Sequence, residues 1–318
     1  MNWAASRYKI RSSIITIILI VSVSLAAAPA LAADGPGTTG ALYLRLPVST
    51  RSIAMGEASA ALPGDPFGWV TNPGARRHGR TMGIGLFHSQ WALETYYDNA
   101  SFEAPLGGMF TLHAGLTYLS APEVQGYDLT GLPTQSLKNS DFQGIVGITF
   151  EPVEYLGIGM NVKYFQEVIA DWTASGAAVD LGASARLVET GLSAGVSVLN
   201  IGQKVAFITH EAELPLTVRA GAAWRRTVVP GALSLTLAAD AVAPIHEDIY
   251  PALGAEIEIR ETFCLRAGFN GDPGLEDSGF SAGGGIRLAK RLLIDYAWTP
   301  YGDLGDFHRI SIWFGLGD

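Results

Sequence analysis

From residue 214 onward the chain alternates apolar and polar side chains in one stretch after another. The first apolar row consists of Leu214, Leu216, Val218, Ala220, Ala222 and Trp224. Similar rows begin at Leu233 and Leu253, and charged residues such as Arg219 stand between the row members. A period of two is that of a β-strand, whose successive side chains point to opposite faces. One face of each predicted strand therefore suits hydrocarbon, whereas the other accepts charge.

The same alternation, followed along the chain, predicts about fourteen strands from residue 81 onward. They lie near residues 81–88, 94–105, 109–120, 141–151, 154–168, 174–187, 191–202, 214–226, 231–243, 249–259, 262–270, 279–289, 291–299 and 306–316. Every second connection is tight, whereas those between are mostly longer and polar or rich in glycine and proline, above all 121–139, 202–213 and 271–278. Outer-membrane barrels show this asymmetry, with short periplasmic turns and long outer loops. We therefore predict an all-β fold, a transmembrane antiparallel β-barrel.

Residues 1–32 carry the marks of a secretory signal peptide. The apolar run 14–28 follows three basic residues and precedes Ala30-Leu31-Ala32, which fits a cleaved signal. A retained membrane anchor is the alternative, but about 15 apolar residues fall short of the roughly 20 that a spanning helix needs. We expect cleavage near Ala32, which leaves an N-terminal segment over residues 33–80 and a barrel over residues 81–318.

Composition and motifs argue against several classes of function. The chain has 318 residues and a formal net charge of −9, and no basic stripe is present to neutralise the phosphates of a nucleic acid. The single cysteine, Cys264, cannot form an internal disulfide. Two G-x-S-x-G strings surround Ser193 and Ser281, but each begins an alternating strand instead of the strand-turn-helix that a nucleophilic serine needs. No zinc motif includes the histidines. We expect a protein that is not an enzyme and that binds no cofactor or metal.

Charged residues fall on the rows that a barrel would turn toward its lumen. These lumen candidates are Asp180, Arg186, Arg219, Asp240, Glu256, Glu258, Arg266, Arg287, Asp295 and Arg309. Both signs occur on neighbouring strands, which favours mutual pairing inside the barrel. A selectivity ring is the alternative, and it would need charges of one sign to cluster.

Residues 34–80 do not alternate, and glycine and proline punctuate them. The alternatives are a disordered linker and a packed plug. Apolar content disfavours disorder, and plugs fill the lumen of known barrels. We predict a plug, or hatch, with Gly56, Asp65, Asn72 and Pro73 as its candidate site residues.

Several motifs together resemble the PorV/PorQ family of outer-membrane proteins. The motifs are Gly37-Thr38-Thr39-Gly40, Arg51-Ser52-Ile53-Ala54-Met55-Gly56, Asn72-Pro73-Gly74-Ala75, and residues 174–182, 200–202, 214–221 and 302–311. More distantly, the stretch from Gly56 to Pro73 resembles the hatch of FadL-type long-chain fatty acid transporters. Two features depart from the family pattern. Asp65 stands alone where an acidic pair is usual, and Gly74-Ala75 inverts the more common order.

The resemblance implies a role in protein secretion, because the PorV/PorQ family includes the type IX secretion shuttle. That shuttle receives secreted proteins by their C-terminal signal domains. The loop 121–139, with Tyr127, Leu129 and Leu132, is the part that we assign to such a partner. An ordinary solvated loop is the alternative, since outer loops vary freely.

Two other hypotheses stay open beside secretion. A FadL-like channel would carry long-chain fatty acids or another hydrophobic small molecule, with Phe110, Met160, Phe165 and Phe207 as candidates to line an acyl pocket. A structural barrel without cargo is the third hypothesis. In all three, outer-membrane lipid surrounds the protein.

Overall fold

The computed structural model describes residues 38–75, 81–207, 210–274, 279–288 and 291–316. The predicted signal peptide and its cleavage near Ala32 lie outside the described residues. Among the described residues, no helix is long and apolar enough to cross a bilayer.

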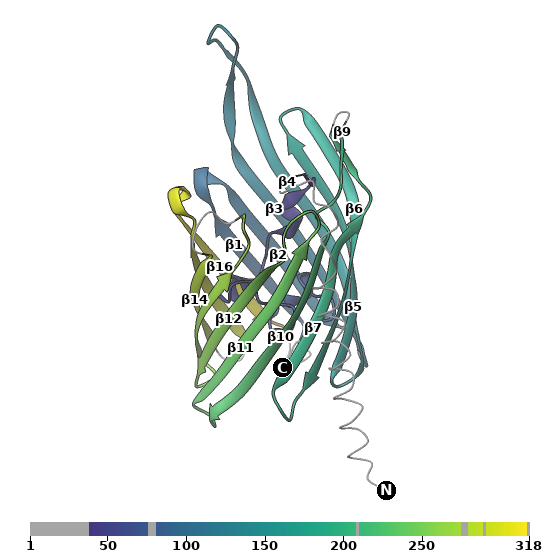
Figure 1. Ribbon diagram of the computed structural model, residues 1–318, viewed down its shortest axis with the longest axis vertical. Helices are drawn as coiled ribbons and strands as arrows, with labels where there is room; N and C mark the ends of the chain where they lie inside the picture. The colour runs from purple at the N-terminus through teal and green to yellow at the C-terminus, as the bar shows by residue number, and fades with distance from the viewer. Residues whose placement is uncertain (1–37, 76–80, 208–209, 275–278, 289–290, 317–318) are drawn as a thin grey trace.

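Fourteen antiparallel strands close into one barrel, as the alternation predicts (Figure 1). Each strand pairs with its neighbours in sequence, β7 pairs with β10, and β1 pairs with β16 to close the wall. The strands are β1 Gly83–Gln90, β2 Tyr96–Pro105, β3 Phe110–Tyr127, β4 Pro133–Val153, β5 Leu156–Ile169, β6 Trp172–Leu187, β7 Leu192–Gly202, β10 Thr217–Val229, β11 Leu233–Pro244, β12 Tyr250–Ile259, β13 Phe263–Asn270, β14 Phe280–Leu288, β15 Leu292–Pro300 and β16 Asp306–Gly315.

The two faces of the wall differ in chemistry. On β16, Ile310 and Phe314 are exposed on the outside, whereas Arg309 and Ser311 are buried toward the lumen. Unpaired backbone groups at an open edge cannot face hydrocarbon, so a sheet with an apolar outer face has to close on itself. The prediction of a barrel with an apolar outer row and a polar inner row is confirmed.

The connections at the two ends of the barrel are unequal. Tight turns such as Glu154-Tyr155 gather at one end, which we name the turn end. The other end, the loop end, has most of the longer connections, although Ala170-Asp171 between β5 and β6 is as short as a turn. Where two of the loops were expected, the structure has strands instead.

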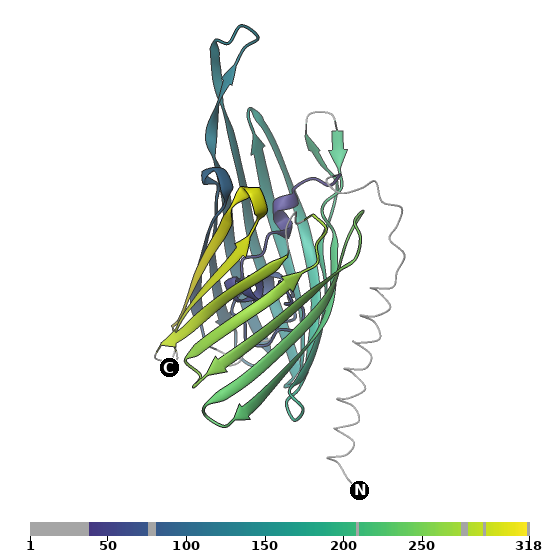
Figure 2. The ribbon, with the colours of Figure 1, turned by 60° about the vertical axis from the view of Figure 1, so that its left-hand side comes forward.

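The predicted loop 121–139 is mostly a continuation of the sheet. Strands β3 and β4 run on past the wall as a hairpin that projects from the loop end, with register shifts between Ala121 and Val124 and between Gln125 and Tyr127 (Figures 1 and 2). Both faces of this hairpin meet water, so its sequence lacks the apolar row by which the other strands are recognised. The predicted loop 202–213 likewise contains a small hairpin, β8 Val205–Phe207 and β9 His210–Ala212.

Residues 38–75, which we name the hatch, lie inside the barrel (Figure 2). They include η1 Leu42–Arg45, α2 Thr50–Ala54 and η2 Gly68–Val70. Helix α2 begins at Ser49, whose hydroxyl oxygen accepts a hydrogen bond from the backbone N–H of Ser52. The hatch starts at the loop end, where the N–H of Gly40 donates to the carbonyl oxygen of Glu213 over 2.9 Å. The segment therefore enters the lumen from the loop end.

Candidate binding cavity at the loop end

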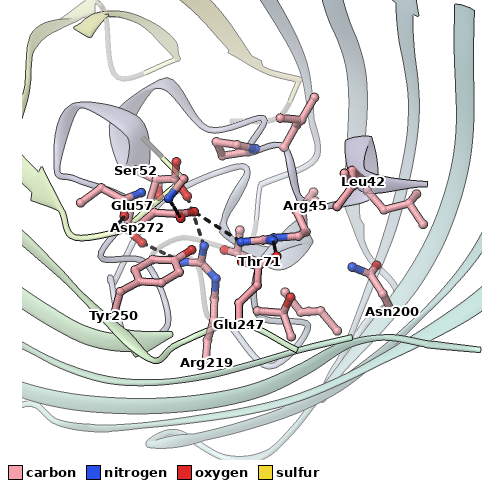
Figure 3. Close-up of a pocket in the computed structure, with 18 of the residues that line it drawn as sticks. Leu42, Arg45, Ser52, Glu57, Thr71, Asn200, Arg219, Glu247, Tyr250 and Asp272 are labelled. Carbon is pink, nitrogen blue, oxygen red and sulfur yellow. Dashed lines mark hydrogen bonds and ion pairs between the residues drawn. The ribbon is translucent and has the colours of Figure 1, made fainter. Parts of the chain in front are cut away.

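A cavity of about 470 Å³ lies between the hatch and the barrel wall near the loop end (Figure 3). Its apolar wall comes mainly from the hatch: a short stretch contributes Leu42, Leu44, Leu46 and Pro47, and η2 contributes Val70. The η1 turn covers Leu42 to Arg45, and Leu46 directly after it has an extended backbone. Leu199 of β7 and four aromatic residues complete this wall: Trp91, Tyr97, Tyr250 and Tyr301.

Most charged side chains in the cavity are paired with one another. Arg45 of the hatch contacts Glu247 over 2.6 Å and Asp272 over 3.3 Å, and both carboxylates come from loop-end connections. Arg219 of β10 donates to the carbonyl oxygen of Glu57 over 2.9 Å and to its carboxylate over 3.2 Å. Figure 3 shows both groups meeting across the cavity. These charges neutralise one another and join the hatch to the wall.

Arg309 of β16 differs from the other cations of the cavity. Its side chain is buried, its guanidinium donates to the hydroxyl of Thr299, and it lies over the ring of Phe307 with 5.6 Å to the centroid. Among the described residues, no carboxylate lies within ion-pair distance of it. Tyr301 stands beside it, and burial raises the pKa of that hydroxyl, which therefore stays protonated. Arg309 is thus a buried cation whose direct contacts are neutral, although the charge of Glu57, which is paired with Arg219, also acts on it.

Stacked aromatic rings stand next to Arg309. The rings of Tyr97, Trp91, Phe307 and Tyr301 follow one another at centroid distances of 6.0, 5.7 and 4.2 Å. All of them except Phe307 line the cavity. The indole N–H of Trp91 is buried and has no hydrogen-bond partner among the described residues. The cavity therefore combines apolar and aromatic surface with a cation.

The lumen charges predicted on β12, β13 and β15 form a buried ion-pair chain with a hatch residue. Arg51 contacts Glu256 over 2.6 Å, Arg266 contacts Glu256 over 2.7 Å, and Arg266 contacts Asp295 over 2.5 Å. A charge buried in this way is stable only when its partners remain in place. Alternation identified the wall residues, but Arg51 lies in the non-alternating hatch and was missed.

Other lumen charges either pair with one another or hydrogen-bond to the hatch. Glu258 contacts Arg225 over 2.6 Å and Arg287 over 3.8 Å. Asp240 accepts hydrogen bonds from the backbone N–H groups of Ser59 and Ala60, each over 2.8 Å.

A third buried group lies on β5 and β6. Asp180 contacts Lys163 of β5 over 2.8 Å, and Lys163 was missed in the sequence. Arg186 is half-buried on β6. Mutual pairing therefore describes most of these charges, and Arg309 is the exception. Their pairing leaves no cluster of one sign among these candidates; Asp141 of β4 and Glu167 of β5, which were not candidates, are two acidic residues that face each other in register.

The hatch residues singled out in the sequence do not line the cavity; they shape and seat the hatch. Asp65 accepts from the hydroxyl of Ser49 over 2.5 Å, and Asn72 donates to the carbonyl oxygens of Ala60 and Ala183 over 2.6 and 3.2 Å. The carbonyl oxygen of Pro73 accepts from Thr149 over 2.6 Å. A side chain at Gly56, whose φ is +63°, would collide with the backbone of β13.

The serines of the two G-x-S-x-G strings also hold the hatch. Ser193 donates to the carbonyl oxygen of Ala61 over 2.9 Å, and Ser281 accepts from the N–H of Gly56 over 3.1 Å. Both serines lie on strands, β7 and β14. Among the described residues, no group of three or more His, Cys, Asp or Glu side chains is arranged to hold a metal ion.

Two of the apolar pocket candidates were placed wrongly. Phe110 and Met160 are exposed on the outside of the barrel, because each belongs to the outward row of its strand. Phe165 is fully buried on the lumen side, against Gly176 of β6. The side chain of Phe207 lies outside the described residues.

The residues assigned to a protein partner lie far from the cavity. Tyr127, Leu129 and Leu132 are exposed at the tip of the β3–β4 hairpin, which Figure 1 shows well beyond the wall. The structure thus separates these residues from the cavity, and their role stays a prediction.

Comparison with solved structures places the fold among outer-membrane barrels. No protein-family model and no curated protein matches the sequence. The chain is similar to the CymD monoaromatic hydrocarbon channel, with a TM-score of 0.62, 11% identity, and coverage of 86% of this chain and 98% of that one. It is also similar to the Ralstonia pickettii toluene transporter TbuX, with a TM-score of 0.60, 13% identity, and coverage of 85% of this chain and 99% of that one. A Pseudomonas aeruginosa FadL homologue gives a TM-score of 0.53, 11% identity, and coverage of 86% of this chain and 99% of that one.

At such low identity these likenesses establish the fold, which is that of integral outer-membrane barrels of the FadL type. They give no support to the PorV/PorQ assignment or to type IX secretion.

Proposed function

We propose that this chain is an outer-membrane channel for a hydrophobic small molecule with an acidic head group, which binds in the loop-end cavity. The FadL-type fold supports the channel, and the apolar hatch stretch supports a hydrophobic ligand. The volume of about 470 Å³ lies within the range of small-molecule sites in proteins. Long-chain fatty acids and other amphiphilic acids fit this description.

The observation that supports an acidic head group is the buried guanidinium of Arg309, which no carboxylate contacts. A buried guanidinium without an anion is unfavourable, because it has lost water without gaining a counter-charge. A carboxylate matches the fork of N–H donors on a guanidinium and forms short, strong hydrogen bonds with it. Tyr301, which also lines the cavity, carries a hydroxyl that can donate to the same carboxylate. The apolar remainder of the ligand would then lie against Leu42, Leu44 and their neighbours.

The proposal is tested with two ligands that differ only in the head group. Dodecanoate and dodecanol are titrated into the purified, folded protein, and their dissociation constants are compared. The protein should prefer dodecanoate. Arg309→Gln should weaken dodecanoate binding about tenfold or more, since a hydrogen bond to a charged group contributes roughly 1.5–3 kcal/mol, and should leave dodecanol binding nearly unchanged.

Arg225→Gln is the matched control. Arg225 is also a lumen-side arginine, but it does not line the cavity and is already paired with Glu258. This variant should keep the preference for dodecanoate. Equal binding of the acid and the alcohol by the unmodified protein, or an Arg309→Gln variant that binds dodecanoate normally, would refute the acidic head group.

A further inference from the structure

A row of aromatic side chains leads from the cavity into the barrel along β1. Trp91 and Tyr97 line the cavity, and the ring of Phe87 meets Tyr97 edge-on at 5.9 Å. Phe67 of the hatch belongs to the same buried cluster as Phe87 and Tyr97, and its ring meets that of Trp313 edge-on at 6.1 Å. We name these five residues the seam. Because β1 runs from the turn end to the loop end, the seam extends from the cavity toward the turn end.

Two glycines make room for the lower part of the seam. Gly83 and Gly85 are lumen-facing positions of β1, in the same row as Phe87. A Cβ atom at Gly85 would come within 2.6 Å of the ring of Phe67, and one at Gly83 would collide with the ring of Trp313. The wall contributes only backbone here, and two aromatic side chains fill the space in front of it. Movement of these two side chains would therefore open a strip along β1.

Other parts of the hatch surface are joined to the wall by polar contacts. Arg51 is paired with Glu256 of β12, and Asp240 of β11 accepts from two backbone N–H groups of the hatch. Asn161 of β5 donates to the carbonyl oxygen of Trp69 over 3.0 Å. A hydrocarbon that passed along these strands would have to separate buried polar partners, which is unfavourable. Along the seam it would displace contacts of aromatic rings with rings and backbone, and the hydrogen bond from the Tyr97 hydroxyl to the carbonyl oxygen of Leu46, over 3.1 Å, lies at the cavity end.

We infer that a hydrophobic molecule bound in the cavity leaves it along the seam, and that Phe67 and Trp313 together form the gate of this route. The inference rests on the proposed function, because it gives the ligand of the loop-end cavity its path inward. The hatch stays in place during passage, held by its polar contacts on β5, β11 and β12. Only the two rings and their near neighbours have to move.

The gate is tested by ion conductance of the full chain in planar lipid bilayers, without any ligand. Phe67→Ala removes one half of the gate, and its conductance should be severalfold that of the unmodified protein. Phe67→Val removes less volume and is the second variant if Phe67→Ala does not fold. Folding is checked for each variant by its mobility on unheated gels, where an intact barrel migrates differently from the unfolded chain.

Phe165→Ala is the matched control. Phe165 is also a fully buried lumen-side phenylalanine, but it lies on β5 against Gly176 and outside the seam. This variant should conduct like the unmodified protein. Added benzene should lower the conductance of Phe67→Ala, because an apolar cavity made by truncation takes up benzene. A hatch that is loosened as a whole would not be resealed in this way.

An unchanged conductance in folded Phe67→Ala and Phe67→Val would overturn the gate. So would an equal rise in Phe165→Ala, or a rise in Phe67→Ala that benzene does not reverse. None of these outcomes depends on the acidic head group, which the dodecanoate titration tests separately. A failure of the gate is therefore distinguishable from a failure of the proposed function.

Discussion

The hatch meets the barrel wall in two different ways on two sides of the lumen. Against β12 and β13 it is joined by buried ions, with Arg51, Glu256 and Arg266 in one chain. Against β1 and β16 it packs through Phe67 onto Gly85 and Trp313. Directional polar bonds fix position, whereas apolar packing tolerates rearrangement at lower cost. The comparison suggests that one side holds the hatch and the other side can let a hydrophobic molecule pass.

The largest expected effect lies on the ion-paired side. Glu256→Ala removes the carboxylate that Arg51 and Arg266 both contact, and leaves the two guanidinium groups buried. The substitution should therefore lower the free energy of unfolding by about 3–5 kcal/mol. Urea unfolding of the protein in lipid vesicles measures this change. Phe165→Ala serves as a reference for the loss of a buried apolar side chain. An exposed ion pair contributes up to roughly 1 kcal/mol. If Glu256→Ala lowers the free energy of unfolding by less than that, the ion-pair chain does not anchor the hatch.

Two glycine substitutions test the same comparison, and we expect them to change the free energy of unfolding by an intermediate amount. A Cβ at Gly268 of β13 would collide with the hatch backbone at Gly56, whereas a Cβ at Gly85 meets the end of the Phe67 ring. Overpacking costs about 1–3 kcal/mol, and more when the neighbour cannot yield. Gly268→Ala should therefore destabilise the barrel more than Gly85→Ala in the same urea measurement. The reverse order would contradict a fixed hatch on the β13 side and a yielding seam on the β1 side.

The smallest expected effect concerns the place where the hatch enters the lumen. The hydrogen bond to His246, together with Lys204, lowers the pKa of Glu213 below its ordinary value of 4.5, and the carbonyl oxygen of the same residue holds Gly40. A lowered folded-state pKa contributes stability that is present above 4.5 and is lost as the pH falls through the folded-state value. Amide exchange at Gly40, corrected for intrinsic rates, should therefore speed up slightly only below pH 4.5.

Glu213→Gln is the matched variant for this pH effect. It keeps the backbone contact but removes the titrating group, so its corrected exchange at Gly40 should not change over the same pH range. If Gly40 exchange in the unmodified protein is equally insensitive to pH, the carboxylate has no part in holding the start of the hatch.

Much of the barrel could be predicted because one face of each strand contacts lipid and the other face contacts the lumen. The outward row on β16, including Ile310 and Phe314, is apolar for a reason that is local to the strand, so alternation reveals it. The β3–β4 hairpin could not be predicted in this way. Beyond the wall both of its faces meet water, and the residues from Ala121 to Asn139 lose the pattern although the backbone pairing continues.

The cavity could be predicted only in part, because it depends on contacts between distant segments. Inward charges such as Glu256 and Arg309 were found from their rows. Nothing in the sequence indicates that Glu256 meets Arg51 across 205 positions while Arg309 has neutral partners. The leucines of η1 likewise resemble an ordinary apolar stretch until the hatch is placed inside the lumen. Secretion followed from motif resemblance alone, and the fold comparison gives it no support.

The most direct test of this account is a crystal structure of the protein with a long-chain fatty acid that carries bromine at its tail. The carboxylate should lie within hydrogen-bond distance of Arg309, and the anomalous signal of bromine should lie inside the barrel beside the hatch leucines or Trp91. Bromine on the outer surface of the wall, or a carboxylate bound away from Arg309, would contradict the account.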